Sequence, residues 1–144
     1  MQIYATIDTN VLVSALYKAD SNPAKILSFV QDGLIIPLLH HDIIEEYIDV
    51  LSRKKFNFNP HIVAELIKEL IKRGKMISEI SSAITDEVSD PDDAIFYAIT
   101  MTTKQNFSDD TYLITGNTKH FPLKPFVVTP TEMLEIINKT SNHN

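Results

Sequence analysis

Acidic side chains provide the most direct indication of chemistry in this sequence. They occur at three places: Asp8, Glu46 and the run Asp90-Pro91-Asp92-Asp93. Carboxylate oxygens in this number suit Mg²⁺ or Mn²⁺ better than Zn²⁺. The chain has no Cys, which excludes disulfides, thiolate zinc sites, iron–sulfur clusters and cysteine nucleophiles. Any metal bound here must therefore be held mainly by oxygen.

Asp8 comes directly after a predicted strand at residues 3–7, which is rich in β-branched and aromatic residues. The turn Thr115-Gly116-Asn117 comes at the end of a later predicted strand. If these strands are parallel neighbours, both turns face the crevice at the carboxyl ends of the sheet, where ligands bind. The alternative is that Asp8 caps the next helix, because Asp-Thr-Asn is rich in capping side chains.

Glu46 lies in the amphipathic helix predicted from Asp42 to about Arg53. At 100° per residue, the apolar residues form one arc: Ile43, Ile44, Tyr47, Ile48, Val50 and Leu51. Glu46 lies at the border of this arc, whereas Glu45 lies on the solvated face. A carboxylate at the edge of a core is the better candidate for a site. The alternative is a surface glutamate whose stem packs against its neighbours.

The run Asp90-Pro91-Asp92-Asp93 opens a predicted helix with a largely apolar body. Asp90 can be the N-cap and Pro91 the first helical residue, and two further acids suit the positive end of the helix dipole. Three acids at one helix tip can also bind a cation through oxygen. The two interpretations are compatible, because one acid can cap while another faces the crevice.

The elements that must position these residues alternate along the chain. The predicted strands are residues 3–7, 34–39, 76–80, 112–115 and 126–128, with Pro37 suggesting an edge position or a bulge in the second. The predicted helices are residues 11–17, 22–32, 42–53, 60–73, 90–102 and 130–137. This order predicts a three-layer α/β/α sandwich with a mainly parallel central sheet. We expect a single domain over residues 1–138 and a disordered tail at 139–144.

Charge and composition narrow the function classes. Of 144 residues, 13 are Lys or Arg and 19 are Asp or Glu, which gives a net charge of −6 that disfavours charge-driven nucleic-acid binding.

Apolar runs are too short for a membrane span, and no signal peptide is visible, so we expect a cytoplasmic protein with no membrane partner. Nucleophile-elbow, Walker and Rossmann motifs are absent, with only three Gly in the chain. An aspartyl phosphatase normally has a second Asp where this chain has Asn10.

Four segments together resemble the PIN-domain family, in the branch described as toxin components of toxin–antitoxin pairs. They are IDTNVLVSAL, the helix Asp-Ile-Ile-Glu-Glu-Tyr, DPDDAIFYA and LITGNTKHFP, in the family's order from about Ile3 to Leu134. The resemblance implies an endonucleolytic, Mg²⁺- or Mn²⁺-dependent ribonuclease with RNA as substrate. An antitoxin protein and a homodimer are partners expected from the family alone.

The resemblance also implies roles for individual residues. The catalytic and metal-binding carboxylates are Asp8, Glu46 and Asp93, with Asp90 as a supporting acid. Glu46 or Asp93 would orient the attacking water. The residues expected to position ligands through hydroxyl or amide groups are Thr9, Asn10 and Thr115.

Asn117 departs from the family's pattern, because many members have Asp at this position. Its amide oxygen can hold a water or bind a metal weakly, and Asn is common in this branch. The neutral side chain nevertheless leaves the pocket less negative, which puts binding of two cations in doubt. It also keeps a second function open, namely a non-catalytic PIN-like RNA- or protein-binding module with a weakened metal site.

Two basic segments could contact RNA. Lys119 and His120 adjoin the Asn117 turn and are placed for a scissile phosphate, although His120 can equally be a structural hydrogen-bonding residue. The run Arg53-Lys54-Lys55-Phe56-Asn57-Phe58 could hold the backbone and stack bases. Alternatively, its cations complement a helix C-terminus and its phenylalanines belong to the core.

Overall fold

The computed structural model describes residues 2–80 and 87–142. Its centre is a five-stranded sheet with the order β3-β2-β1-β4-β5, in which every neighbouring pair is parallel. The strands are β1 (Ile3–Ile7), β2 (Ile35–Leu39), β3 (Lys75–Met76), β4 (Thr111–Ile114) and β5 (Val127–Val128). The α-helices are α1 (Thr9–Tyr17), α2 (Asn22–Gln31), α3 (His41–Leu51), α4 (Pro60–Arg73), α5 (Pro91–Asn106) and α6 (Pro130–Asn142).

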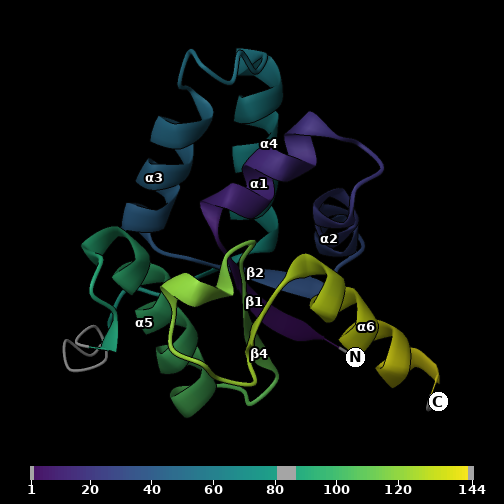
Figure 1. Cartoon of the computed structure of the whole chain (residues 1–144), viewed down its shortest axis with the longest axis vertical. Coiled ribbons are helices and arrows are strands. Elements are labelled where there is room, and N and C mark those ends of the chain that lie inside the picture. The colour runs from purple at the N-terminus through teal and green to yellow at the C-terminus, as the bar shows by residue number, and fades with distance from the viewer. Residues whose placement is uncertain (1, 81–86, 143–144) are drawn as a thin grey trace.

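Helices cover both faces of the sheet, as Figure 1 shows. Helix α5 packs against β1 and β4 on one face, whereas α2 packs against β2 and α6 on the other. The inner strands are buried on both faces, and the apolar core includes Ile7, Leu39 and Ile114, each at most 1% exposed. This arrangement confirms the predicted three-layer α/β/α sandwich.

Several predicted boundaries were wrong. The strand predicted at residues 76–80 ends at Met76, because β2 ends at Leu39 and the backbone N–H of Ile77 already donates to the Leu39 carbonyl, the last ladder partner. Pro37 lies in an inner strand and not at an edge; β3 avoids it by pairing only with Leu38 and Leu39. Residues 81–86 of the predicted polar connection lie outside the described residues.

Helices α5 and α6 are both longer than predicted. Helix α5 continues to Asn106, since Thr100 and Thr103 extend its buried face and the Thr100 hydroxyl donates to Thr6 Oγ1 at 2.8 Å. The disordered tail expected from residue 139 is helical as far as Asn142, and Thr140 Oγ1 donates to the Ile136 carbonyl at 2.9 Å within that extension. Among the described residues, no helix is long and apolar enough to cross a membrane.

The pairing of β1 with β4 positions the candidate site. Ile7 lies opposite Ile114 in the parallel ladder, and the Asp8 backbone N–H donates to the Ile114 carbonyl at 2.9 Å. Asp8 and Thr115 therefore follow adjacent strand ends at the same edge of the sheet. Helices α1, α3 and α5 begin at or near this edge, so their N-terminal turns lie around the carboxyl ends of β1 and β4 (Figure 1).

Candidate active site

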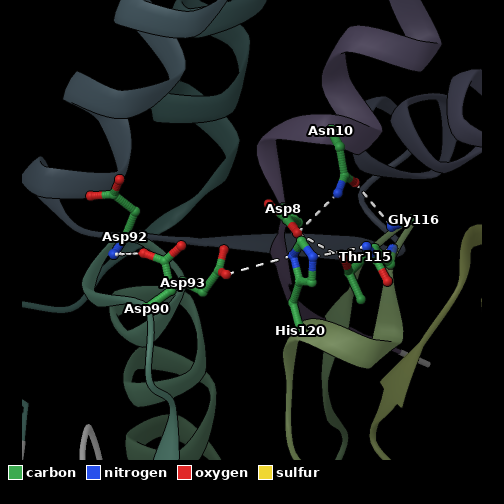
Figure 2. Close-up of polar contacts among 9 residues, drawn as sticks. Asp8, Asn10, Asp90, Asp92, Asp93, Thr115, Gly116 and His120 are labelled. Atoms are coloured by element: carbon green, nitrogen blue, oxygen red, sulfur yellow. Dashed lines mark hydrogen bonds and ion pairs between the residues drawn. The ribbon is translucent and has the colours of Figure 1, made fainter.

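Asp8 is held by its neighbours in the sheet and does not cap the helix that follows it. Its carboxyl group is buried, at 7% exposed, and makes no side-chain capping hydrogen bond to α1. Oδ2 instead accepts hydrogen bonds from Thr115 Oγ1 at 2.7 Å and from Asn10 Nδ2 at 3.2 Å (Figure 2). The capping interpretation of Asp8 was therefore wrong.

Glu46 is brought to the same edge by α3. It is half-buried, whereas Glu45 is exposed, and the Thr9 hydroxyl donates to Glu46 Oε2 at 2.6 Å. The buried Tyr47 hydroxyl donates to the Ile7 carbonyl, the last residue of β1 before Asp8. This contact ties α3 to the end of β1 and so fixes Glu46 beside Asp8.

The acidic residues at the start of α5 have different contacts. Asp90 is the exposed N-cap, and its Oδ1 accepts a hydrogen bond from the Asp92 backbone N–H at 2.9 Å. Asp93 points in the other direction, toward His120, with 19% of its side chain exposed and 3.6 Å between Oδ2 and His120 Nδ1 (Figure 2). Capping and a pocket-facing acid therefore coexist at this helix tip.

His120 lies between Asp93 and Asn117. The Asn117 side-chain nitrogen is 2.9 Å from His120 Nε2, and the other ring nitrogen faces Asp93. An amide that turns over presents its oxygen in place of its nitrogen, so this pair can persist whether the ring is neutral or protonated. Asn117 thus contacts His120 directly, and Lys119 beside it is exposed.

Asn10 joins the two turns at the sheet edge. Its Oδ1 accepts a hydrogen bond from the Gly116 backbone N–H at 2.9 Å while its Nδ2 donates to Asp8. A Cβ at Gly116 would lie 3.1 Å from Asn10 Oδ1, so glycine permits this close approach. A cleft of about 670 Å³ begins at Asn10, Gly116 and Asn117 and extends between α1, α2 and α6. The three carboxyl groups do not line this cleft.

Burial raises the pKa values of Asp8, Glu46 and Asp93, and the charges of neighbouring carboxylates raise those of Glu46 and Asp93 further. Burial raises the pKa of Asp8 above its usual 3.8, against the hydrogen bond from Thr115 and the charge of His120. The pKa of Glu46 is raised from 4.5 first by burial and then by the charges of Asp8, Asp92 and Asp93. Burial followed by the charges of Asp8 and Asp90 raises the pKa of Asp93. The three groups therefore lie within electrostatic reach of one another, an arrangement that a cation would stabilise.

The spacing of the three carboxylates limits how they can hold a metal. Among the described residues, one group of three His, Asp or Glu side chains has ligand atoms all within 4.8 Å of one another, namely His40, His41 and Asp42 at the start of α3. The oxygens of Asp8, Glu46 and Asp93 are thus more widely spaced. Mg²⁺ keeps several waters and binds through one or two carboxylates. The donor set fits such an ion, held partly through water.

The His40 cluster is a separate surface feature. His40 Nδ1 accepts a hydrogen bond from the Asp42 backbone N–H at 3.1 Å and so caps α3. His41 and Asp42 are exposed, with 3.0 Å between His41 Nε2 and Asp42 Oδ1. These contacts account for the cluster as a helix cap with an exposed polar contact beside it.

Fold and site together define an α/β domain with a cluster of acidic side chains at the carboxyl edge of a parallel sheet. Comparison with protein-family models matches residues 4–119 to the PIN domain. The chain therefore belongs to the PIN-domain family, a fold that in general is that of a metal-dependent nuclease and typically binds divalent ions. A search of curated proteins found no match.

Sequence reasoning missed the residues that position the others. Tyr47 was assigned only to the apolar face of α3, yet its hydroxyl anchors the helix beside Asp8. Gly116 was noted as part of a turn, and its N–H contact with Asn10 was not anticipated. Asp92 was seen only as part of the helix tip, although its charge acts on Glu46. The one signal in the sequence for these positioning contacts was Tyr47, a residue with a polar hydroxyl directly after Glu46 on the apolar face of the helix.

Proposed function

We propose that this chain is a Mg²⁺- or Mn²⁺-dependent ribonuclease that hydrolyses RNA phosphodiester bonds endonucleolytically. The observation that carries the proposal is the convergence of Asp8, Glu46 and Asp93, each with a raised pKa, at one edge of a PIN-domain sheet. Such a cluster of ionisable groups with shifted pKa values is typical of a functional site.

The three carboxylates would hold the ion, and Asp90, which is exposed and caps α5, would support it only weakly through its charge. When bound, a divalent ion lowers the pKa of a bound water and neutralises charge that develops on the phosphate. Thr9 fixes one oxygen of Glu46, which orients the other to accept a hydrogen bond from the attacking water. Thr115 and Asn10 hold Asp8 in the same way.

Lys119 supplies positive charge near the acidic cluster, and His120 lies beside it. Asp93 faces one ring nitrogen of His120 and Asn117 the other, so these two residues would hold the ring beside the metal site and position it next to Lys119. Lys119 is exposed beside it and can follow the RNA backbone. The charge of Lys119 would offset part of the acidic balance that disfavours RNA.

A matched pair on one helix tests this assignment. Purified wild type, Glu46→Gln and Glu45→Gln are incubated with a mixed RNA pool in Mg²⁺, Mn²⁺ or chelator. We expect metal-dependent cleavage by wild type and Glu45→Gln, and its loss in Glu46→Gln. Equal cleavage by the two variants, or cleavage that persists in chelator, contradicts the proposal, because a contaminating ribonuclease would give the same result with every variant.

We further propose that the ribonuclease is the toxin component of a toxin–antitoxin pair, with a cognate antitoxin and a homodimeric state. This role predicts that expression of wild type arrests growth, that Asp8→Asn relieves the arrest, and that a small co-expressed protein forms a complex with the chain. Unimpaired growth with active wild-type protein contradicts the toxin role and leaves the ribonuclease proposal standing.

Asn117 favours one alternative, a non-catalytic RNA- or protein-binding module. The residue contributes no charge where many PIN domains have Asp, and it engages His120. A protein that binds RNA but cleaves none of it in either metal is this module and not the enzyme.

A further inference from the structure

Three aromatic rings from two segments meet on the surface at the end of α1. Tyr17, the last residue of α1, has its ring centroid 6.0 Å from that of Phe56 and 5.1 Å from that of Phe58. The two phenylalanine rings are stacked, with a centroid distance of 5.6 Å and an interplanar angle of 9°. Tyr17 is 61% exposed and the phenylalanines are half-buried, with Phe58 packed against the edge of the core, so the cluster is a surface feature that rests on the core.

The loop between α3 and α4 is shaped to present these rings. Its turn is closed by hydrogen bonds from the Phe56 N–H to the Arg53 carbonyl and from the Asn57 N–H to the Lys54 carbonyl, both at 3.1 Å. Asn57 has a φ of 54°, a left-handed conformation that Asn tolerates better than most residues. The turn brings Phe56 and Phe58 to the same side as parallel rings.

Positive charge surrounds the rings. Residues 52–60 contain three cations and no acid, in a chain whose net charge is −6. Arg53 is paired with Asp49 on α3 at 3.0 Å, and Lys55 Nζ lies 5.0 Å from the Phe56 ring centroid. Within the described part of the chain, neither Lys54 nor Lys55 forms a salt bridge. Tyr17, Phe56, Phe58, Lys54 and Lys55 are called the aromatic patch below.

Helix α1 connects the aromatic patch to the candidate active site. It begins directly after Asp8 and ends at Tyr17, a length of about 13 Å for its residues. The cleft that starts at Asn10 and Asn117 continues along α1 past Ser14 to Lys18, the neighbour of Tyr17. An extended RNA strand a few nucleotides long can therefore contact both places.

Resting on the proposed function, we propose that the aromatic patch is a base-stacking surface for single-stranded RNA, separated from the catalytic carboxylates by the length of α1. Exposed rings flanked by unpaired cations are the two components of sequence-tolerant binding to single strands. A cluster that only anchored the loop would need neither the exposed Tyr17 ring nor the adjoining lysines. The patch also supplies the positive region that the chain's overall charge lacks.

The experiment measures the affinity of a dye-labelled single-stranded RNA in an Asp8→Asn background with chelator, where no cleavage occurs. Tyr17→Leu keeps an apolar side chain but removes the ring, and we expect binding about tenfold weaker or more. Tyr17→Phe retains full affinity. Binding of inorganic polyphosphate, which has charge but no bases, is unchanged by Tyr17→Leu.

The matched control is Phe107, an exposed ring with its own cation, which lies near Tyr4 at the start of β1. Phe107 is 55% exposed and Lys75 Nζ lies 4.1 Å from its ring centroid. Phe107→Leu leaves RNA affinity unchanged. Replacing Lys54 and Lys55 by Gln makes the slope of log affinity against log salt shallower by about 1.4, the value for two phosphate contacts on a single strand.

The outcomes separate this proposal from the proposed function. Tyr17→Leu with wild-type RNA affinity overturns the stacking surface, as does an equal loss of RNA and polyphosphate binding. An unchanged salt slope in the Lys54→Gln/Lys55→Gln protein overturns the role of the cations. If wild type cleaves RNA while Tyr17→Leu binds and cleaves normally, the patch is wrong and the ribonuclease stands. If RNA binding depends on Tyr17 but wild type cleaves nothing, the patch stands and the ribonuclease is wrong.

Discussion

Helices α1 and α5 both begin after an aspartate with an extended backbone, but the two side chains do different things. Asp90 caps α5 through the Asp92 N–H and is exposed. Asp8 makes no capping bond to α1, is 7% exposed, and accepts hydrogen bonds from Thr115 and Asn10.

The difference shows that surroundings, and not helix position, decide what an aspartate does. One partner of Asp8, Asn10, is two residues away, but the other, Thr115, directly follows β4 and is 107 residues away in the sequence. Asp90 finds its partner two residues away. A local hydrogen bond makes a cap, whereas long-range contacts turn an otherwise similar residue into a buried carboxylate that a cation can neutralise.

The largest effect is expected for the same change at both helix starts. Asp8→Asn removes a carboxylate that would hold the metal. We expect RNA cleavage to fall by more than about 100-fold, because mutating a residue that only hydrogen-bonds to a metal ligand already lowers activity by up to about 100-fold. Asp90→Asn leaves an equally good cap and should change the rate little. Initial cleavage rates at saturating Mn²⁺ measure both. Similar losses in the two variants would remove the distinction between the two residues.

Thr9 and Pro91, which follow Asp8 and Asp90, also differ in their contacts. Thr9 is buried and donates to Glu46, whereas Pro91 is exposed at the equivalent position of α5. Thr9→Val frees the Glu46 carboxylate to rotate, so we expect a roughly tenfold lower rate of RNA cleavage.

Thr102→Val is the control for this change, since the Thr102 hydroxyl has no hydrogen-bond partner in the described part of the chain. Its rate should match wild type. A Thr9→Val enzyme with wild-type activity would show that Glu46 needs no positioning by Thr9.

Loss of the Asp90 cap should lower the free energy of unfolding and leave the rate of RNA cleavage almost unchanged. Asp90→Ala removes the hydrogen bond to the Asp92 N–H, which costs about 1 kcal/mol in the free energy of unfolding. Urea unfolding in chelator measures it. Asp90→Asn keeps a side chain that caps as well as Asp, so it should show no such loss. A destabilisation of Asp90→Asn equal to that of Asp90→Ala would contradict the assignment of this loss to the cap.

The smallest effect concerns pH. Burial and neighbouring charges raise the pKa values of Asp8 and Asp93 above 3.8 and that of Glu46 above 4.5. The folded protein therefore binds more protons than the unfolded chain just above these values, and its stability falls as pH rises through the raised pKa values.

Asp8→Asn removes one of the three groups and should flatten this fall, whereas Asp90→Asn keeps most of it. Urea midpoints between pH 4 and 8 without divalent ions measure the dependence. A wild-type stability that instead rises over this interval would contradict burial of the carboxylates as the dominant cause.

Much of the site could be predicted because its parts follow local rules. Strand 3–7 ends where β-branched residues give way to Asp8, and helical periodicity distinguished Glu46 from Glu45 at the edge of the apolar arc. The helix tip at Asp90 follows from capping chemistry and Pro91.

The rest depends on contacts between distant segments, which periodicity does not encode. The Tyr47 hydroxyl meets the Ile7 carbonyl across 40 residues, and His120 meets Asp93 across a loop and a strand. The alternatives for Phe56 and Phe58, core or surface, likewise depended on the neighbouring Tyr17.

The central claim is that Asp8, Glu46 and Asp93 form one site for a divalent cation. Titration of the metal-free protein with Mn²⁺ tests it most directly, with wild type, Asp8→Asn and Asp90→Asn compared at neutral pH. The account predicts one ion per chain for wild type and Asp90→Asn, and affinity for Mn²⁺ much reduced or lost in Asp8→Asn. Equal affinity and stoichiometry in all three proteins would contradict it, because the ion would then bind without Asp8.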